Sequence, residues 1–265
     1  AVELLVQPNV GCPHDYVLTP QDMQRLADAD VLVVNGLGME GFLDKAVRQA
    51  NAKLKIIDSS AGIDQLLPRH ADSAGDGQEG HDRHEHGQYN PHLFADPKMA
   101  AVVVRNIARQ LSEHYPTGRD RFITNANALA DEMEKLGEEY RKAGQRFERR
   151  AIITQHDVFD YLARTAGLAV VATVQAEPGQ PPSAARRLQL SDKIKSEKVA
   201  AIFVEPQYSD DGGLAAILAQ AGGVQAIPLD PVATGPADPP SDYYLTQMRR
   251  NLDTLKAVLG QKPQR

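Results

Sequence analysis

"DRFITNANALADEMEKLGEEYRKAGQRFER", residues 120–149, is the stretch that decides the fold. Its apolar side chains recur at alternating spacings of four and three residues, which predicts one long amphipathic helix, about 45 Å long if unbroken. The recurring positions are Phe122, Ala126, Leu129, Met133, Leu136 and Tyr140. Two internal glycines, Gly137 and Gly144, weaken this helix somewhat. A helix of this length either forms a rigid spine between two halves of a protein or covers a single core.

On both sides of this segment, short β-rich runs alternate with helical patterns. The expected strands are 2–7, 30–34, 54–60, 151–154, 169–174, 200–205 and 224–229. The expected helices are 19–29, 97–111, 157–166, 184–197, 212–221 and 242–259. Thr19 precedes Pro20, which is the usual pairing of an N-cap with the first helical position. This alternation predicts an α/β fold with mainly parallel sheets and helices on their faces.

Residues 68–91 interrupt the alternation. They are rich in Gly, Asp, His, Pro and Ser and contain almost nothing apolar. Burial of such a segment does not offset the entropy of ordering it, so we expect a flexible surface loop.

The composition excludes several classes of protein. The 265 residues suffice for one large domain or two smaller ones, and the net charge of −6 attracts neither nucleic acid nor an anionic membrane. The one cysteine, Cys12, excludes an intrachain disulfide and a four-cysteine zinc site. No run of 18 apolar residues is present. The sequence opens on a strand-like run, so we expect that any secretion signal was removed or never present.

Four residues in predicted loops share a chemistry and a place in the fold: His14, His92, His156 and Asp230. Three of them closely follow a predicted strand, and ligands of open α/β sheets bind at that carboxyl edge. Two come from each half of the chain, so a cleft between the halves is their natural meeting place. Three imidazoles and a carboxylate suit zinc first. For each histidine taken alone, a surface or capping residue remains the simpler interpretation.

Three of the histidines in the loop at 68–91 lie close together in the sequence: His81, His84 and His86. Two interpretations stay open for them: weak, rapidly exchanging metal binding, or a solvated polar loop.

Catalytic motifs fit poorly. The sequence contains no H-E-x-x-H, no G-x-S-x-G and no P-loop. Cys12 lies two residues from His14, but no partner that would orient such a Cys–His pair can be picked out, and a soft metal ligand is the better interpretation of this cysteine.

Several segments nevertheless resemble one family along nearly the whole chain and in the right order. "PHDYVLTP" opens the first, at 13–45, and "NPHLFADP" opens the second, at 90–116; the others are 153–168, 202–209 and "PLDP" at 228–231. A histidine before Y-x-x-[TS]-P, a PH-x-[FW]-x-DP segment and a late LDP are similar to those of the zinc/manganese ABC-transporter solute-binding proteins. Members often carry a His/Asp/Glu-rich loop before the second ligand, as this chain does.

The resemblance implies two α/β lobes, with mainly parallel sheets flanked by helices, joined by one long rigid backbone helix. The expected divisions are 1–118 with the histidine-rich loop at 70–91, the connecting helix at 119–149, and 150–265. Carried over, the metal ligands are His14, His92, His156 and Asp230, and Glu205 supports the site without binding the ion. Histidine at position 156 resembles zinc-type members, since several manganese members have glutamate there.

The function implied is capture of Zn²⁺ in a closed four-coordinate site and delivery to an ABC import permease, with Mn²⁺ as the alternative metal. This is binding and not catalysis, by a monomer in the periplasm or attached to the outer surface. The loop histidines would hold metal loosely and pass it to the main site, or would take it from a periplasmic metallochaperone. The alternatives are a manganese-specific binding protein, a zinc-dependent hydrolase and a metal-stabilised surface adhesin. Two departures from the family are Cys12 and the lack of another strand and helix before residues 2–7.

Overall fold

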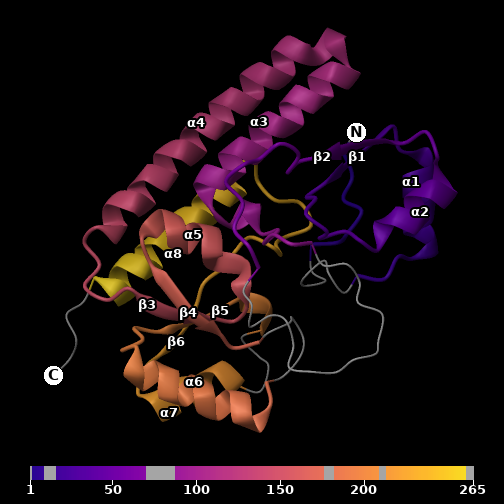
Figure 1. Cartoon of the computed structure of the whole chain (residues 1–265). Helices are drawn as coiled ribbons and strands as arrows, with labels where there is room; N and C mark the ends of the chain where they lie inside the picture. The colour runs from indigo at the N-terminus through magenta and orange to yellow at the C-terminus, as the bar shows by residue number, and fades with distance from the viewer. Residues whose placement is uncertain (1, 9–15, 70–86, 176–181, 209–212, 261–265) are drawn as a thin grey trace.

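The computed structural model describes residues 2–8, 16–69, 87–175, 182–208 and 213–260. Two groups of strands lie apart in the molecule, and two long helices run alongside both (Figure 1). The helices are α1 (Pro20–Asp28), α2 (Leu43–Ala50), α3 (Pro97–His114), α4 (Arg119–Gly144), α5 (Asp160–Ala166), α6 (Ala184–Ser196), α7 (Leu214–Gly222) and α8 (Tyr243–Leu259). The strands are β1 (Val31–Val34), β2 (Lys55–Asp58), β3 (Ala151–Thr154), β4 (Ala169–Thr173), β5 (Ile202–Val204) and β6 (Ala226–Pro228). Short 3-10 turns are η3 (Leu93–Ala95), η4 (Pro116–Gly118), η5 (Asp157–Phe159) and η6 (Pro206–Tyr208).

The long helix is α4, with 26 residues. It lies antiparallel to α3, and the turn η4 joins the two (Figure 1). Arg105 of α3 pairs with Asp131 at 2.8 Å and with Glu134, both on α4. The inner face of α4 buries Leu136 and Tyr140, and the Tyr140 hydroxyl donates to the carbonyl of Met248 on α8 at 2.5 Å. This helix therefore covers the core of the C-terminal lobe and packs along α3.

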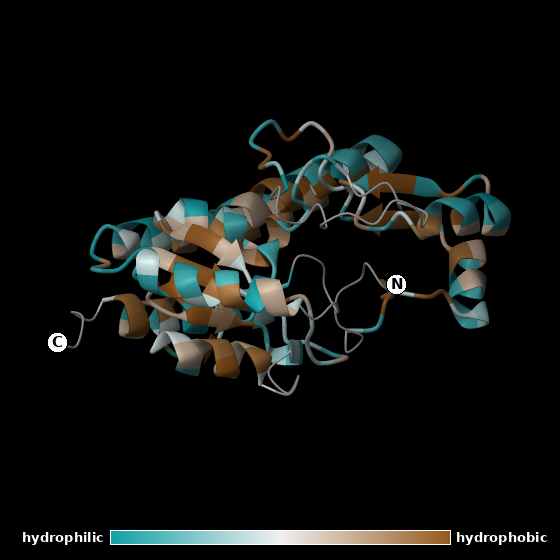
Figure 2. Cartoon of the chain, turned by 60° about the horizontal axis from the view of Figure 1, so that its bottom comes forward, coloured by the Kyte–Doolittle hydropathy of each residue, from teal (hydrophilic) through white to brown (hydrophobic). Residues whose placement is uncertain are grey.

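The C-terminal lobe is built on a four-stranded parallel sheet of order β4-β3-β5-β6. Consecutive residues of β3 point to opposite faces. Ile152 enters a core with α4, α5 and α8, and Ile153 enters a second core with α6 and α7. Figure 1 shows α5 and α8 on one side of this sheet and α6 and α7 on the other. In Figure 2 these strands are largely brown, whereas the covering helices mix teal and brown, as amphipathic helices do.

The N-terminal lobe consists of the parallel pair β1–β2 with α1 and α2. Leu26, Leu43 and Val47 form its core. The side chain of Thr19 accepts from the backbone of Asp22 and completes a capping box, as its place before Pro20 predicts. Helix α2 is an element that the sequence analysis did not predict.

The strand expected at 2–7 is wrong. Residues 2–8 form no strand, and the side chain of Val2 is 98% exposed. Within the described ranges, β1 pairs only with β2. Alternating apolar residues make a strand only where a neighbouring strand takes up their backbone groups, and none of the strands that the structure describes pairs with residues 2–8.

Helix α3 connects the two lobes. The side-chain amide of Asn106 donates to the carbonyls of Ser59 and Ala61, each at 2.8 Å, and the N-terminal end of α3 packs in the core of the C-terminal lobe. None of the helices described here is both long and apolar enough to cross a bilayer.

Candidate metal centre

The carboxyl edge of the C-terminal sheet carries polar side chains after three of its strands. His156 follows β3, Glu205 directly follows β5, and Asp230 follows β6. Backbone hydrogen bonds continue the sheet pairing past the strand ends, from Gln155 to Phe203 and from Leu229 to Val204, each 2.9 Å long. The parallel order of the sheet therefore places these three side chains at one edge.

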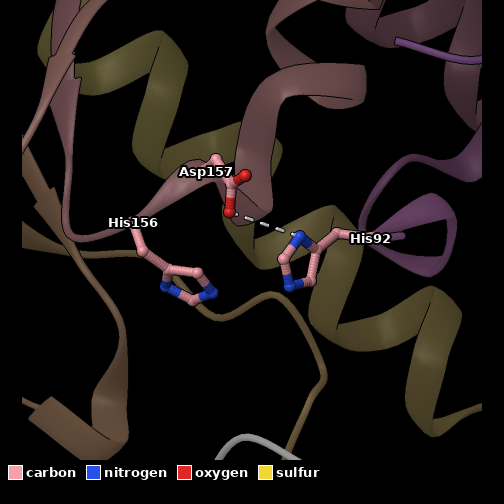
Figure 3. Close-up of side chains that lie close together, drawn as sticks. All are labelled: His92, His156 and Asp157. Carbon is pink, nitrogen blue, oxygen red and sulfur yellow. Dashed lines mark ion pairs between the residues drawn. The ribbon is translucent and has the colours of Figure 1, made fainter. Parts of the chain in front are cut away.

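His92 reaches the same edge from the segment before α3. Its ring lies 5.0 Å from the ring of His156, centroid to centroid, at an interplanar angle of 77°. The two residues are only 1% and 2% exposed. Figure 3 shows both rings together with Asp157, and one potential ligand atom from each of the three lies within 4.8 Å of the others. Among the described residues, this is the group that is able to hold a metal ion.

One nitrogen of His156 is held by a carboxylate. Its Nδ1 pairs with Oε1 of Glu205, a residue with no exposed surface, and Gln207 donates to Oε2 of Glu205 at 2.6 Å. Burial lowers the pKa of His156, but the charge of Glu205 and its hydrogen bond raise this pKa by more in total, so it lies above the ordinary value. A carboxylate accepts the Nδ1 proton and leaves the lone pair on Nε2, which is buried and has no hydrogen-bond partner within the described residues.

The corresponding nitrogen of His92 is held by residues that the sequence analysis missed. Nδ1 of His92 lies 2.9 Å from Oδ1 of Asn90 and 3.6 Å from Oδ1 of Asp157. Oδ2 of Asp157 lies 3.9 Å from Nε of Arg69. The signals available in the sequence were that Asp157 adjoins His156 and that Asn90 lies two residues before His92. Both are local, and neither reveals that the two segments meet.

Asp230 lies at the same edge but outside this three-residue group. Its Oδ1 accepts from the backbone of Val232 at 2.8 Å, and its carbonyl accepts from Asn251 at 2.5 Å. Burial raises the pKa of the Asp230 carboxyl, and the nearby charge of Glu205 raises it further. Val232 has a φ of 64°, a strained value for a β-branched residue, so the loop after β6 is held in an unusual conformation.

Several expected metal-binding residues lie outside the described residues. These are His14 and the three loop histidines His81, His84 and His86.

Comparison with known proteins identifies the family. A family model described as "Zinc-uptake complex component A periplasmic" matches residues 1–258. The chain belongs to this zinc-uptake component A family. The resemblance inferred from the sequence is thereby confirmed, and the family is one of uptake components, not of enzymes.

Two curated members illustrate the relationship. The chain is 30% identical over 263 residues to the zinc-binding lipoprotein AdcA of Streptococcus pneumoniae (strain ATCC BAA-255 / R6), covering 98% of this chain and 52% of that protein. It is 30% identical over 273 residues to the high-affinity zinc uptake system protein ZnuA of Bacillus subtilis (strain 168), covering 97% of this chain and 80% of that protein. The chain thus spans about half the length of the first of these relatives.

Similar solved structures confirm the fold. A crystal structure of ZnuA is similar with a TM-score of 0.79 at 27% identity, over 98% of this chain and 90% of that one. The laminin-binding protein Lmb of Streptococcus agalactiae, described as having adhesin and metal transporting activity, gives 0.78 at 26% identity, over 96% and 89%. The expected α/β architecture, with parallel sheets and a long connecting helix, is therefore correct.

Proposed function

We propose that this chain captures Zn²⁺ and delivers it to an ABC import permease. One observation carries the proposal: two buried histidines lie edge to face, and an oxygen lies beside Nδ1 of each, so that Nε2 is the ring nitrogen of each that would bind the ion. Membership of a zinc-uptake family supports the same conclusion.

The ligand set that we propose is His14, His92, His156 and Asp230, with Glu205 orienting His156. Asp157 is the carboxylate nearest to both histidines. Because its Oδ1 faces Nδ1 of His92, which points away from the proposed ion, we assign Asp157 to orienting His92. Four protein ligands close a tetrahedral zinc site and leave no position for an activated water molecule, so the site binds and does not hydrolyse.

Zinc is the metal that we propose because imidazole-rich sites prefer it to manganese. Manganese remains the alternative, since the binding protein FpvC of Pseudomonas aeruginosa, solved in complex with Mn²⁺, is similar at 25% identity with a TM-score of 0.78. Elemental analysis of protein purified without added metal, followed by a competition titration of Zn²⁺ against Mn²⁺, decides between them. We expect one equivalent of tightly bound zinc that excess manganese does not displace.

The proposed setting is the periplasm or the outer surface of a membrane. The proposed partners are the permease and a periplasmic zinc metallochaperone, and the proposed state is a monomer. The likeness to Lmb favours one further candidate, a surface adhesin in which metal serves stability. Growth in low zinc separates the two: deletion of an import protein slows growth and added zinc restores it, whereas deletion of an adhesin leaves growth unchanged.

Deletion of residues 71–88 should leave one tight zinc site and remove the weaker ones. The three histidines His81, His84 and His86 bind metal through few ligands, so their sites exchange quickly, whereas the proposed ligands lie outside the deleted segment. Isothermal titration of the intact and shortened proteins measures this. If the shortened protein loses tight binding instead, the loop contributes to the principal site.

Zinc affinity should fall as the pH drops, because a protonated imidazole does not bind metal. The charge of Glu205 raises the pKa of His156 above its ordinary value of 6.5, so proton competition at this ligand begins above that pH. Glu205→Gln removes the charge and leaves burial, which lowers the pKa. The acid limb of the affinity profile should therefore move to lower pH.

Titrations across a pH series measure this shift. Glu134→Gln removes a surface carboxylate that pairs with Arg105, far from the site in the fold, and should leave the profile unchanged. An acid limb that stays in place in Glu205→Gln contradicts the role given to Glu205.

A further inference from the structure

Asn90 is a buried polar residue outside the proposed ligand set, with no exposed surface. Its side-chain amide nitrogen donates to the carbonyl of Asp157 at 2.7 Å and to Oδ2 of Asp160 at 3.0 Å. Its Oδ1 accepts from the backbone nitrogen of His92 at 2.9 Å and lies 2.9 Å from Nδ1 of the same histidine. One side chain thus contacts both sides of the candidate site.

These partners fix the orientation of the Asn90 amide. Both groups opposite its nitrogen are acceptors only, a carbonyl and a carboxylate, so the nitrogen must face them and the oxygen must face His92. An amide oxygen only accepts, so Nδ1 of His92 carries the proton and Nε2 carries the lone pair.

The backbone of Asn90 is fixed as well. Its nitrogen donates to the carbonyl of Leu67 at 2.8 Å, and its carbonyl accepts from the hydroxyl of Tyr161 on α5 at 2.8 Å. The backbone nitrogen of Leu67 donates to the same hydroxyl at 3.1 Å. Asn90 is therefore anchored through both its backbone and its side chain to the first turns that follow β3.

We propose that Asn90 is a positioning residue that holds His92 in its metal-binding tautomer and fixes it beside His156 before the ion arrives. The proposal rests on the proposed zinc-binding function. In this arrangement His92 is attached to the C-terminal lobe, although the segment that carries His92 precedes α3 in the chain. The pair His92–His156 then forms half of the site before the ion arrives.

The test uses metal-free protein and the Asn90→Ala variant. Long-range ¹H–¹⁵N spectra of the imidazole rings report which nitrogen carries the proton, and the signal of His92 is assigned by its loss in His92→Ala. We expect Nδ1–H alone in the wild type and a mixture of tautomers in Asn90→Ala. The variant should also bind zinc about 10- to 100-fold more weakly, the usual cost of removing a partner that orients a ligand.

Asn106→Ala is the matched control. It also removes a side-chain amide that bonds two carbonyls, but away from the site, and should keep both the tautomer and the affinity of the wild type. An unchanged His92 tautomer together with unchanged affinity in Asn90→Ala overturns the proposal. The spectra are recorded without metal, so they report the tautomer of His92 whether or not the protein binds zinc. If the wild type binds no zinc, the proposed function is wrong, but the test of the tautomer still stands.

Asn90→Asp covers the case in which the alanine variant does not fold. It keeps an oxygen opposite His92 and loses the amide hydrogens that reach Asp157 and Asp160. We expect the Nδ1–H tautomer to persist while amide hydrogen exchange at residues 157–160 speeds up in the metal-free protein. Loss of the tautomer, or exchange at 157–160 as slow as in the wild type, contradicts the proposed arrangement.

Discussion

Replacing His92 with alanine should weaken zinc binding by about two orders of magnitude. The free energy of zinc binding at structural sites is about 10–16 kcal/mol, so each of four ligands contributes on the order of 3 kcal/mol. His92 is 1% exposed, so truncating its side chain removes a buried nitrogen and leaves a cavity in its place. His156→Ala should have an effect of the same size. Competition against a coloured chelator of known affinity measures both.

His114→Ala is the control for these variants. His114 is the last residue of α3 and is not part of the three-residue group, so its removal should not change the affinity for zinc. Wild-type affinity in His92→Ala would rule out the proposed ligand set.

The same assay distinguishes the two carboxylates near the histidines. Asp230→Asn should weaken binding more than Asp157→Asn if Asp230 binds the ion and Asp157 orients His92. The opposite ranking would assign the ligand role to Asp157, which the described residues place closer to both histidines.

Gly144→Ala should destabilise the fold by about 3 kcal/mol and lower the melting temperature by roughly 10 °C. A Cβ atom on Gly144 would lie 1.8 Å from the carbonyl oxygen of Ala166 at the end of α5. The obstacle is backbone and not a flexible side chain, so α4 and α5 have to move apart. This cost exceeds the gain of roughly 1 kcal/mol that alanine brings to a helix.

Gly41→Ala is the matched control, because the nearest atom to its added Cβ lies 3.9 Å away. Thermal unfolding of the two variants, followed by circular dichroism, should show a lowered transition for Gly144→Ala alone. Equal transitions would mean that α4 and α5 are not in close contact in solution.

Gly144 shows which features of a helix the spacing of apolar residues predicts and which it does not. The spacing of apolar residues correctly predicts a long helix over 120–149, although α4 ends at Gly144. From the sequence, Gly144 only weakens the helix. Its actual role depends on the carbonyl of Ala166, which no local pattern contains, because the contact arises from packing between two helices.

The residues of the candidate site also differ in whether the sequence alone predicts their positions. The rule that ligands follow parallel strands predicts His156 and Asp230 at one sheet edge, and both lie there. Glu205 lies at the same edge, but only the family resemblance pointed to it. The role of Asn90 depends on hydrogen bonds to Asp157 and Asp160, 67 and 70 residues away, and nothing in "NPH" encodes those partners.

The contact between α4 and α8 also constrains the order in which the molecule is completed. The hydroxyl of Tyr140 reaches the carbonyl of Met248, 108 residues later, and Leu252, Leu255 and Leu259 close the same core. A chain synthesised or translocated from its N-terminus therefore exposes the part of α4 that α8 covers until α8 emerges. Contacts so distant in sequence form slowly, and partly folded intermediates of this kind aggregate readily. We therefore expect truncation within α8 to leave this part of the core exposed and to lower the yield of folded protein.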